Sequence, residues 1–336
     1  MRGTLKSDTK VSTLTIRYKI GRYKFIRTQT LKSLVNIYPF IAIFLISLVS
    51  GCYKFSGDQT IPAYFTISGI NLTTYFPEEG SNSSDVDNVW VYLNDGLIGV
   101  YVFPESDTIP VEFPVLAQGK NKLEIRPGIK LNGITSTRVP YVFYKPIIFD
   151  EFDFIPGTTQ ALGELTTSYY SDTKFAWLED FEATNISISD FGDTIIERTE
   201  PENNPIAFIT PTSRFSGEIT LTPEKPVYTG ISYNSFEMEI PGTITMLELN
   251  FKTNNFIQVG VLIRNNDGTI PEKELIILNH TDEWKKIYIN LGSNLSLYPL
   301  AYDYKVIFRA GLESEHEEGK ILIDNQNIEH IDPDYL

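Results

Sequence analysis

Cys52 is the residue whose chemistry is easiest to specify, because it is the only cysteine in the chain. With no second cysteine it cannot form an intramolecular disulfide, but its thiol can be alkylated to a thioether. An apolar run at residues 34–49 and the small residues Ser50 and Gly51 directly precede it. Such a run is short for a membrane span and suits the central part of a secretory leader. The apolar run and the small residues after it predict a secretory leader that ends close to Cys52.

The tetrapeptide Val49-Ser50-Gly51-Cys52 resembles the lipobox of bacterial lipoproteins. This resemblance implies a covalent diacylglycerol on the Cys52 sulfur and an N-acyl chain, such as palmitate, on its new amine. Two or three acyl chains together hold a protein on a bilayer almost permanently. Tyr53 follows the cysteine, where an inner-membrane retention signal would have aspartate. We therefore expect an outer-membrane anchor, on the periplasmic face or at the cell surface.

The leader at residues 1–51 is longer than the usual 15–30 residues and is strongly basic. It holds nine Lys or Arg residues and one acid, Asp8. A start at Leu31 would give a leader of ordinary length, so residues 1–30 are interpreted as a mis-assigned start. The alternative is a basic cytoplasmic extension with an uncleaved membrane anchor.

Removing the leader makes the protein strongly acidic. The 28 basic and 43 acidic residues fall to 19 and 42, so the mature chain carries a net charge of about −23. A polyanion repels nucleic acid and anionic headgroups, which excludes both as ligands. It is compatible with divalent cations.

Residues typical of catalysis are sparse. His280, His316 and His330 are far apart in sequence, and no glycine-rich phosphate loop or nucleophile elbow is present. A glycoside hydrolase needs only two carboxylates, but nothing in the sequence selects a pair. We expect a non-catalytic protein, with a glycoside hydrolase or lyase as a less favoured alternative.

The segments that must position these groups are short and alternate between apolar and polar residues. Leu247, Leu249 and Phe251 share one face of such a segment, and Ile287, Ile289 and Leu291 share a face of another. Asn94-Asp95-Gly96 predicts a hairpin turn between two of them. The pattern predicts an all-β protein.

Two β domains are expected after a lipid tether at residues 52–60. The first covers residues 61–145 and has the strand spacing of an immunoglobulin-like sandwich. Its segments 91–99 and 119–123, with Pro104 between them, resemble small β domains of the PEGA type, common in bacterial envelope proteins. Residues 146–174 are predicted to be a linker, because their second half is rich in Thr, Ser and Gly; within this linker, the alternating segment 148–154 is a candidate strand that joins the two units.

The second domain, residues 175–331, opens with Trp177-Leu178-Glu179-Asp180-Phe181-Glu182, has a late strand that begins at Trp284, and closes on Asp324-Asn325. This order resembles the jelly rolls of carbohydrate-binding modules and the wider galactose-binding-like group. Tether, small β domain and jelly roll together resemble Bacteroidota cell-envelope lipoproteins.

The jelly-roll resemblance implies a structural calcium ion. Its ligands would be acids of the first and last strands, which here are Asp180, Glu182 and Asp324. Carboxylate oxygens suit calcium, which takes six to eight oxygen ligands. The alternative is that Asp324 caps a turn and Glu182 is a solvated strand residue.

Aromatic side chains are the other candidates for ligand contact, because sugar rings stack on flat apolar surfaces. Trp177, Tyr228 and Tyr233 are the candidate ligand-binding residues, with Tyr228 and Tyr233 in a turn-rich segment. The alternative for each is a packing role.

Two functions remain open at this point. The favoured one is an accessory or binding subunit of an outer-membrane complex, acting through protein–protein contacts. The alternative is a surface lipoprotein that binds a glycan through the jelly roll.

Overall fold

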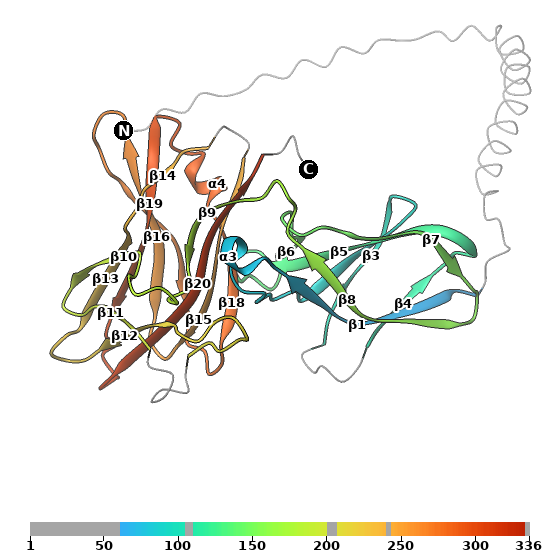
Figure 1. Cartoon of the computed structure of the whole chain (residues 1–336), viewed down its shortest axis with the longest axis horizontal. Helices are drawn as coiled ribbons and strands as arrows, with labels where there is room; N and C mark the ends of the chain where they lie inside the picture. Colours follow the sequence, from blue (N-terminus) through green and yellow to red (C-terminus); the bar gives the residue numbers. More distant parts are fainter. Residues whose placement is uncertain (1–60, 105–109, 200–206, 240–242, 333–336) are drawn as a thin grey trace, which may run out of the picture. The chain divides into compact units, whose positions relative to one another are not determined.

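Two β-sandwiches make up the described chain, shown in Figure 1 as a computed structural model. The structure describes residues 61–104, 110–199, 207–239 and 243–332. The leader, Cys52 and the tether lie outside these residues. Within them, no helix has the length and apolarity needed to cross a bilayer. The predicted all-β class is confirmed.

The first sandwich packs two sheets around an aromatic core. In the described residues, β4-β1-β8 form one sheet, with β1 and β8 parallel, and β3-β2-β5-β6 form the other, with β7 beside β5. Phe65 and Phe113 stack between them with ring centroids 4.6 Å apart. The elements are β1 (Ala63–Thr73), α3 (Phe76–Glu79), β2 (Asn88–Leu93), β3 (Gly96–Val102), β4 (Val111–Val115), β5 (Gly119–Lys130), β6 (Arg138–Pro140), β7 (Ile147–Phe154) and β8 (Thr159–Ser168).

The predicted hairpin at Asn94-Asp95-Gly96 joins β2 to β3. Asn94 and Asp95 have φ values of 48° and 66°. Two successive left-handed residues give the turn a twist that matches the flanking strands. The left-handed positions are therefore Asn94 and Asp95, one residue earlier than the Asp-Gly pair on which the prediction was based.

The segment predicted to be a linker, residues 146–174, instead contains β7 and β8. β7 pairs with β5 and β8 pairs with β1, so both strands belong to the first sandwich. Composition misled the prediction because Thr is also a good strand residue when half of a strand faces solvent. In β8 the buried residues Leu165 and Thr167 alternate with exposed ones.

The second sandwich has the two facing sheets of a jelly roll. In the described residues, the first sheet has the order β10-β13-β19-β16-β17 with β14 beside β19, and we call it the β16 sheet. The second has the order β11-β12-β20-β15-β18 with β9 beside β20, and we call it the β15 sheet. The elements are β9 (Lys174–Glu179), β10 (Ile188–Gly192), β11 (Ile196–Arg198), β12 (Gly217–Leu221), β13 (Val227–Ser232), β14 (Phe236–Glu237), β15 (Ile244–Thr253), β16 (Ile257–Asn265), β17 (Glu272–Leu278), β18 (Lys285–Asn290), α4 (Gly292–Leu295), β19 (Ala301–Gly311) and β20 (Gly319–Ile331).

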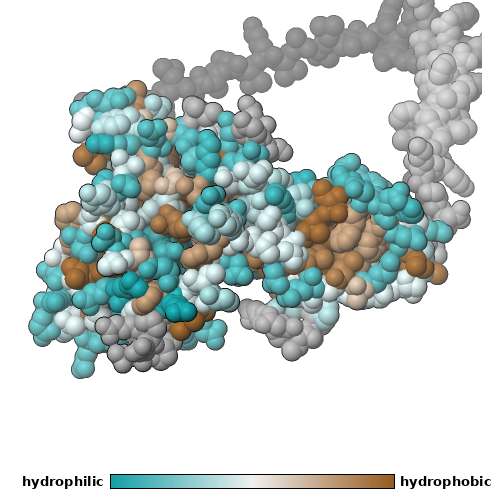
Figure 2. Space-filling model, in the orientation of Figure 1, coloured by the Kyte–Doolittle hydropathy of each residue, from teal (hydrophilic) through white to brown (hydrophobic). Residues whose placement is uncertain are grey.

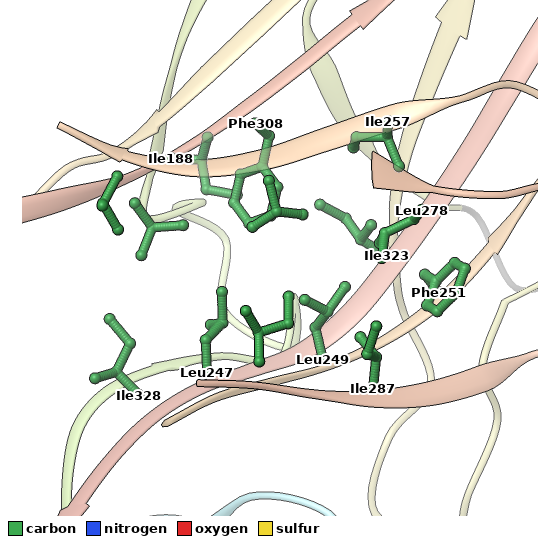
Figure 3. Packing of buried hydrophobic residues seen from close by; sticks show 14 of the residues in the cluster. Ile188, Leu247, Leu249, Phe251, Ile257, Leu278, Ile287, Phe308, Ile323 and Ile328 are labelled. Atoms are coloured by element: carbon green, nitrogen blue, oxygen red, sulfur yellow. The ribbon is translucent and has the colours of Figure 1, made fainter. Parts of the chain in front are cut away.

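The core of this sandwich is formed by the apolar faces that the alternating sequence predicts. Leu247, Leu249 and Phe251 of β15 lie opposite Ile257 and Phe308 of the β16 sheet (Figure 3). Ile287, Ile289 and Leu291 also belong to this cluster. Since successive strand residues point to opposite sides, the intervening polar residues must lie on the outer faces of the two sheets.

The outer face of the β15 sheet is buried, because residues of the first sandwich pack on it. Tyr141 of the first sandwich and Tyr288 of β18 have ring centroids 4.7 Å apart. This contact belongs to a third apolar cluster at the junction. Both sandwiches lie within one compact unit, Ile61–Leu336.

Charged residues also occupy this junction. Glu248 of β15 and Lys286 of β18 form an ion pair with 0% and 2% of their side chains exposed. The Tyr141 hydroxyl lies 2.5 Å from Glu248 Oε1 and 3.0 Å from Glu329 Oε2, and Tyr169 donates to Glu248 at 3.2 Å. A buried ion pair persists only when its remaining hydrogen-bonding capacity is met, as it is here.

Candidate functional site

Of the three aromatic residues predicted to bind a ligand, two are in the core. Trp177 is 6% exposed, and its Nε1 donates to Ser187 Oγ at 2.8 Å. Tyr228 is fully buried between the sheets, where burial and the neighbouring Asp190 raise its pKa. The prediction is wrong for both, because strand alternation turns these side chains inward. Tyr233, at 71% exposure, is on the surface.

The three predicted calcium ligands are placed differently from one another. Asp324 is fully buried, and burial together with nearby Asp180 raises its pKa. It accepts hydrogen bonds from Ser216 Oγ at 2.9 Å and from the Asn325 amide at 2.6 Å. Glu182 instead accepts the amide protons of residues 214 and 215, at 2.6 and 2.9 Å. The structure therefore brings Asp180 and Asp324 together and uses Glu182 to anchor a loop.

Asp180 and Asp324 carry like charges that repel each other, so a cation between them would be favourable. The side-chain amide of Asn325, next to Asp324, has neither of its polar atoms hydrogen-bonded. A buried carboxylate beside a second carboxylate and an unused amide oxygen matches the oxygen ligands of calcium. In the described chain, however, no group of three or more His, Cys, Asp or Glu side chains is arranged to hold a metal. Calcium stays a prediction.

Calcium can be tested through stability. If Asp180 and Asp324 hold calcium, EDTA should lower the melting temperature of the full chain, and Asp324→Ala should abolish that sensitivity. If no ion binds there, Asp324→Asn should raise stability at pH 7, because a raised carboxyl pKa lowers stability as pH rises above the unfolded value of 3.8. Thermal unfolding with EDTA and with added calcium separates the two outcomes.

The exposed side of the β16 sheet carries a second set of candidates, which sequence analysis missed. Phe308 and Ala310 of β19 are in the core, so Arg309 between them points outward. Its guanidinium donates to both carboxylate oxygens of Glu272, at 2.8 and 2.7 Å, and to Thr229 Oγ1 at 3.1 Å. This ion pair raises the pKa of Arg309, while the hydrogen bond from Arg309 lowers that of Glu272.

Two exposed aromatic residues belong to the same sheet as this arginine. Strand pairing places Phe191, 55% exposed, beside Thr229, and Thr229 beside Arg309. Tyr233 directly follows β13, and its carbonyl accepts a hydrogen bond from Lys305 Nζ at 2.7 Å. We call this surface the β16 face and define it by Phe191, Thr229, Tyr233, Gln258, Glu272, Lys305 and Arg309. It combines flat apolar groups with fixed donors and acceptors, which is the combination that sugars require.

The signal that could have identified Arg309 is its place as the one charged residue between Phe308 and Ala310, although the apolar run 306–308 interrupts the alternation of β19. Its partners Glu272 and Thr229 lie 37 and 80 residues away, so no local pattern connects them. Long-range contacts also bring the rings of His280 and His316 to a centroid separation of 5.6 Å, although their spacing in sequence predicts no shared face.

The first sandwich presents a different kind of surface. Apolar residues gather on it in the view of Figure 2. On β3, Ile98, Val100 and Val102 are 40–46% exposed at alternate positions. On the adjacent strands, Arg126 lies 4.6 Å over the ring of Tyr92. Exposed apolar side chains in a row are typical of protein contact surfaces rather than of sugar sites.

One pair of carboxylates is close together, but it cannot reach a substrate. Glu248 and Glu329 are both fully buried at the junction beneath Tyr141 and Tyr169. Glycoside hydrolysis needs two carboxylates that flank a bound sugar. This pair therefore does not supply the accessible acids of a hydrolase.

Comparison with known proteins gives structural neighbours only. No family model matches the chain, and no curated protein matches it. Many solved structures are similar in part, and three of them serve as examples. The CBM22-1 xylan-binding domain of Paenibacillus barcinonensis Xyn10C is 10% identical, with 48% of this chain and 97% of that chain covered and a TM-score of 0.35.

A variant of the family 29 carbohydrate-binding module CBM29-2, complexed with mannohexaose, is 10% identical over 47% of this chain and 92% of that chain, with a TM-score of 0.31. The enzymatically active domain of bacteriophage CBA120 tailspike protein 4 is 12% identical over 52% of this chain and 26% of that chain, with a TM-score of 0.35. At these values the likeness says nothing about ligand or activity.

Proposed function

We propose that this protein is a non-catalytic, lipid-anchored envelope protein that binds a glycan on the β16 face. The observation that carries the proposal is that two exposed rings, Phe191 and Tyr233, belong to the same sheet face as an arginine that Glu272 and Thr229 hold in place. Rings supply stacking surface, and the fixed guanidinium supplies directed hydrogen bonds to hydroxyl groups. The anchor is Cys52, and the outer membrane is the proposed location.

Tyr233→Ala tests this face with little risk to the fold, because the side chain is 71% exposed. We expect retardation of the full chain by its polysaccharide ligand to weaken about tenfold, or ~1.4 kcal/mol. Affinity electrophoresis through gels that contain different neutral polysaccharides measures this. Tyr75→Ala, a tyrosine of the first sandwich that is 62% exposed, is the matched control and should leave binding unchanged. Failure of every polysaccharide to retard the wild type would refute the proposal.

A second function is favoured by the apolar stripe of β3. Under this alternative the protein is an accessory subunit of an outer-membrane complex, and Ile98, Val100 and Val102 contact another envelope protein. Purification of the tagged protein from native membranes would then yield a stoichiometric partner. Val100→Asp should release that partner, whereas Tyr233→Ala should not.

A further inference from the structure

A groove at the junction of the two sandwiches has the size and chemistry of a ligand site. One cavity of about 490 Å³ is lined by residues of both sandwiches, including Ser83, Asn250 and Trp284. A second cavity of about 300 Å³ shares the lining residues Asp85, Lys130, Lys285 and Lys286 with it. We call the two together the junction groove. Volumes of this order are typical of small-molecule sites.

A buried acceptor in the groove has no partner. Asn250 is 2% exposed, and its Nδ2 donates to Ser83 Oγ at 2.7 Å. Its Oδ1 accepts no hydrogen bond from the described residues. Buried carbonyl oxygens are nearly always hydrogen-bonded in native proteins. A hydroxyl group of a ligand could therefore donate a hydrogen bond to this oxygen.

An aromatic wall lies beside this acceptor. Trp284 is half-buried, its ring centroid is 5.4 Å from that of Phe208, and both side chains line the larger cavity. An indole that lines a polar cavity can stack on the apolar face of a sugar ring. A flat apolar wall and an amide acceptor together favour a saccharide over a simple ion.

Positive charges around the groove outnumber the negative charges by one. Lys130 and Arg138 share Asp87, at 3.3 and 2.9 Å, and Lys286 pairs with Glu248. Lys285 is exposed, and among the described residues it makes no ion pair within 4.0 Å; the charge that it senses at longer range is that of Asp85, which also lies near Lys130. The excess of one positive charge suits a ligand with one negative charge.

Hydrogen bonds within the protein hold the walls of the groove in place. Lys286 Nζ donates to the Ser83 carbonyl at 2.9 Å, and the Asp85 amide donates to the Tyr288 hydroxyl at 2.9 Å. These contacts hold the loop of the first sandwich against β18. A site that is already ordered loses less conformational entropy on binding.

We propose that the junction groove binds one acidic sugar unit, a uronate, within an otherwise neutral glycan. Lys285 pairs with the carboxylate, Asn250 Oδ1 accepts a hydrogen bond from a sugar hydroxyl and Trp284 stacks on the ring. A long polyanion is disfavoured, because the mature chain carries a net charge of about −23. The groove is separate from the β16 face, and this inference does not rest on the function proposed there.

Titration calorimetry of the full chain in detergent tests the groove, with xylotriose that bears one glucuronate and plain xylotetraose as probes. The acidic probe should bind at least tenfold more tightly. Lys285→Gln should remove that preference, and Trp284→Ala should weaken both probes. Lys120→Gln, an exposed lysine of the first sandwich, is the control and should change neither.

Equal affinity for the two probes, no binding of the acidic probe, or an unchanged preference in Lys285→Gln would each overturn the inference. Lys285 is exposed, so this variant stays informative if Trp284→Ala fails to fold. Tyr233→Ala separates the two proposals. It should leave the uronate preference intact while it weakens polysaccharide binding, so either site can fail alone.

Discussion

Replacing Glu248 by Gln should lower the free energy of unfolding by about 3–5 kcal/mol. Glu248 is the carboxylate that neutralises Lys286, whose side chain is 2% exposed. Without it, a buried ammonium group keeps its desolvation cost and loses the compensating charge. The Tyr141 and Tyr169 hydroxyls also lose a charged acceptor. Equilibrium urea unfolding, followed by circular dichroism at pH 7, measures the change.

Glu329→Gln is the matched control, because Glu329 is also fully buried on the same sheet face. Burial and the nearby charge of Glu248 raise the pKa of Glu329 well above 4.5. A proton on Glu329 can be donated to the carboxylate of Glu248, and this hydrogen bond is a further cause of the raised pKa. A neutral amide therefore mimics the native state of Glu329, and this variant should be as stable as the wild type or more stable at pH 7.

The stability of the wild type and the stability of Glu329→Gln should depend differently on pH. A carboxyl group whose folded pKa is raised favours the native state most below its unfolded value. Its contribution is lost as pH rises from about 4.5 through the folded pKa. The wild type should lose stability over that window relative to Glu329→Gln. Equal destabilisation by Glu248→Gln and Glu329→Gln at pH 7 would contradict this assignment of charges.

Cys52→Ser should move the protein from the membrane fraction to the soluble fraction almost completely. The serine hydroxyl cannot form the thioether, so the diacylglycerol is not attached and the N-acyl chain has no mature amine to modify. Each buried methylene contributes about 0.8 kcal/mol to membrane binding, so loss of two or three chains removes essentially all of the affinity. Fractionation of cells labelled with a palmitate analogue measures both location and acylation.

Ser50→Thr, which keeps the cysteine, should leave acylation in place and serves as the control. Intact-mass analysis of the native protein gives a second readout. A polypeptide that begins upstream of residue 52, or that carries no acyl mass there, would contradict the anchor. It would also favour the alternative of an uncleaved basic extension.

Strand identity and the apolar faces of the second sandwich follow from the sequence alone. Leu247, Leu249 and Phe251 alternate with polar residues, and this period places them in one core whatever the sheet order. The turn at Asn94 and Asp95 is equally local, because it depends on residues that tolerate positive φ. Such features need only neighbouring residues, which is why they were predictable.

Only the tertiary structure decides what covers each polar face. Glu248 and Arg309 each lie between core residues of a strand, yet one is sealed at the junction and the other is exposed beside Glu272. Periodicity specifies the side of a sheet on which a residue lies, but not whether water or a second sandwich lies beyond it. For the same reason Trp177 and Tyr228 were mistaken for surface groups, and the junction groove, made by residues from two sandwiches, has no local signature.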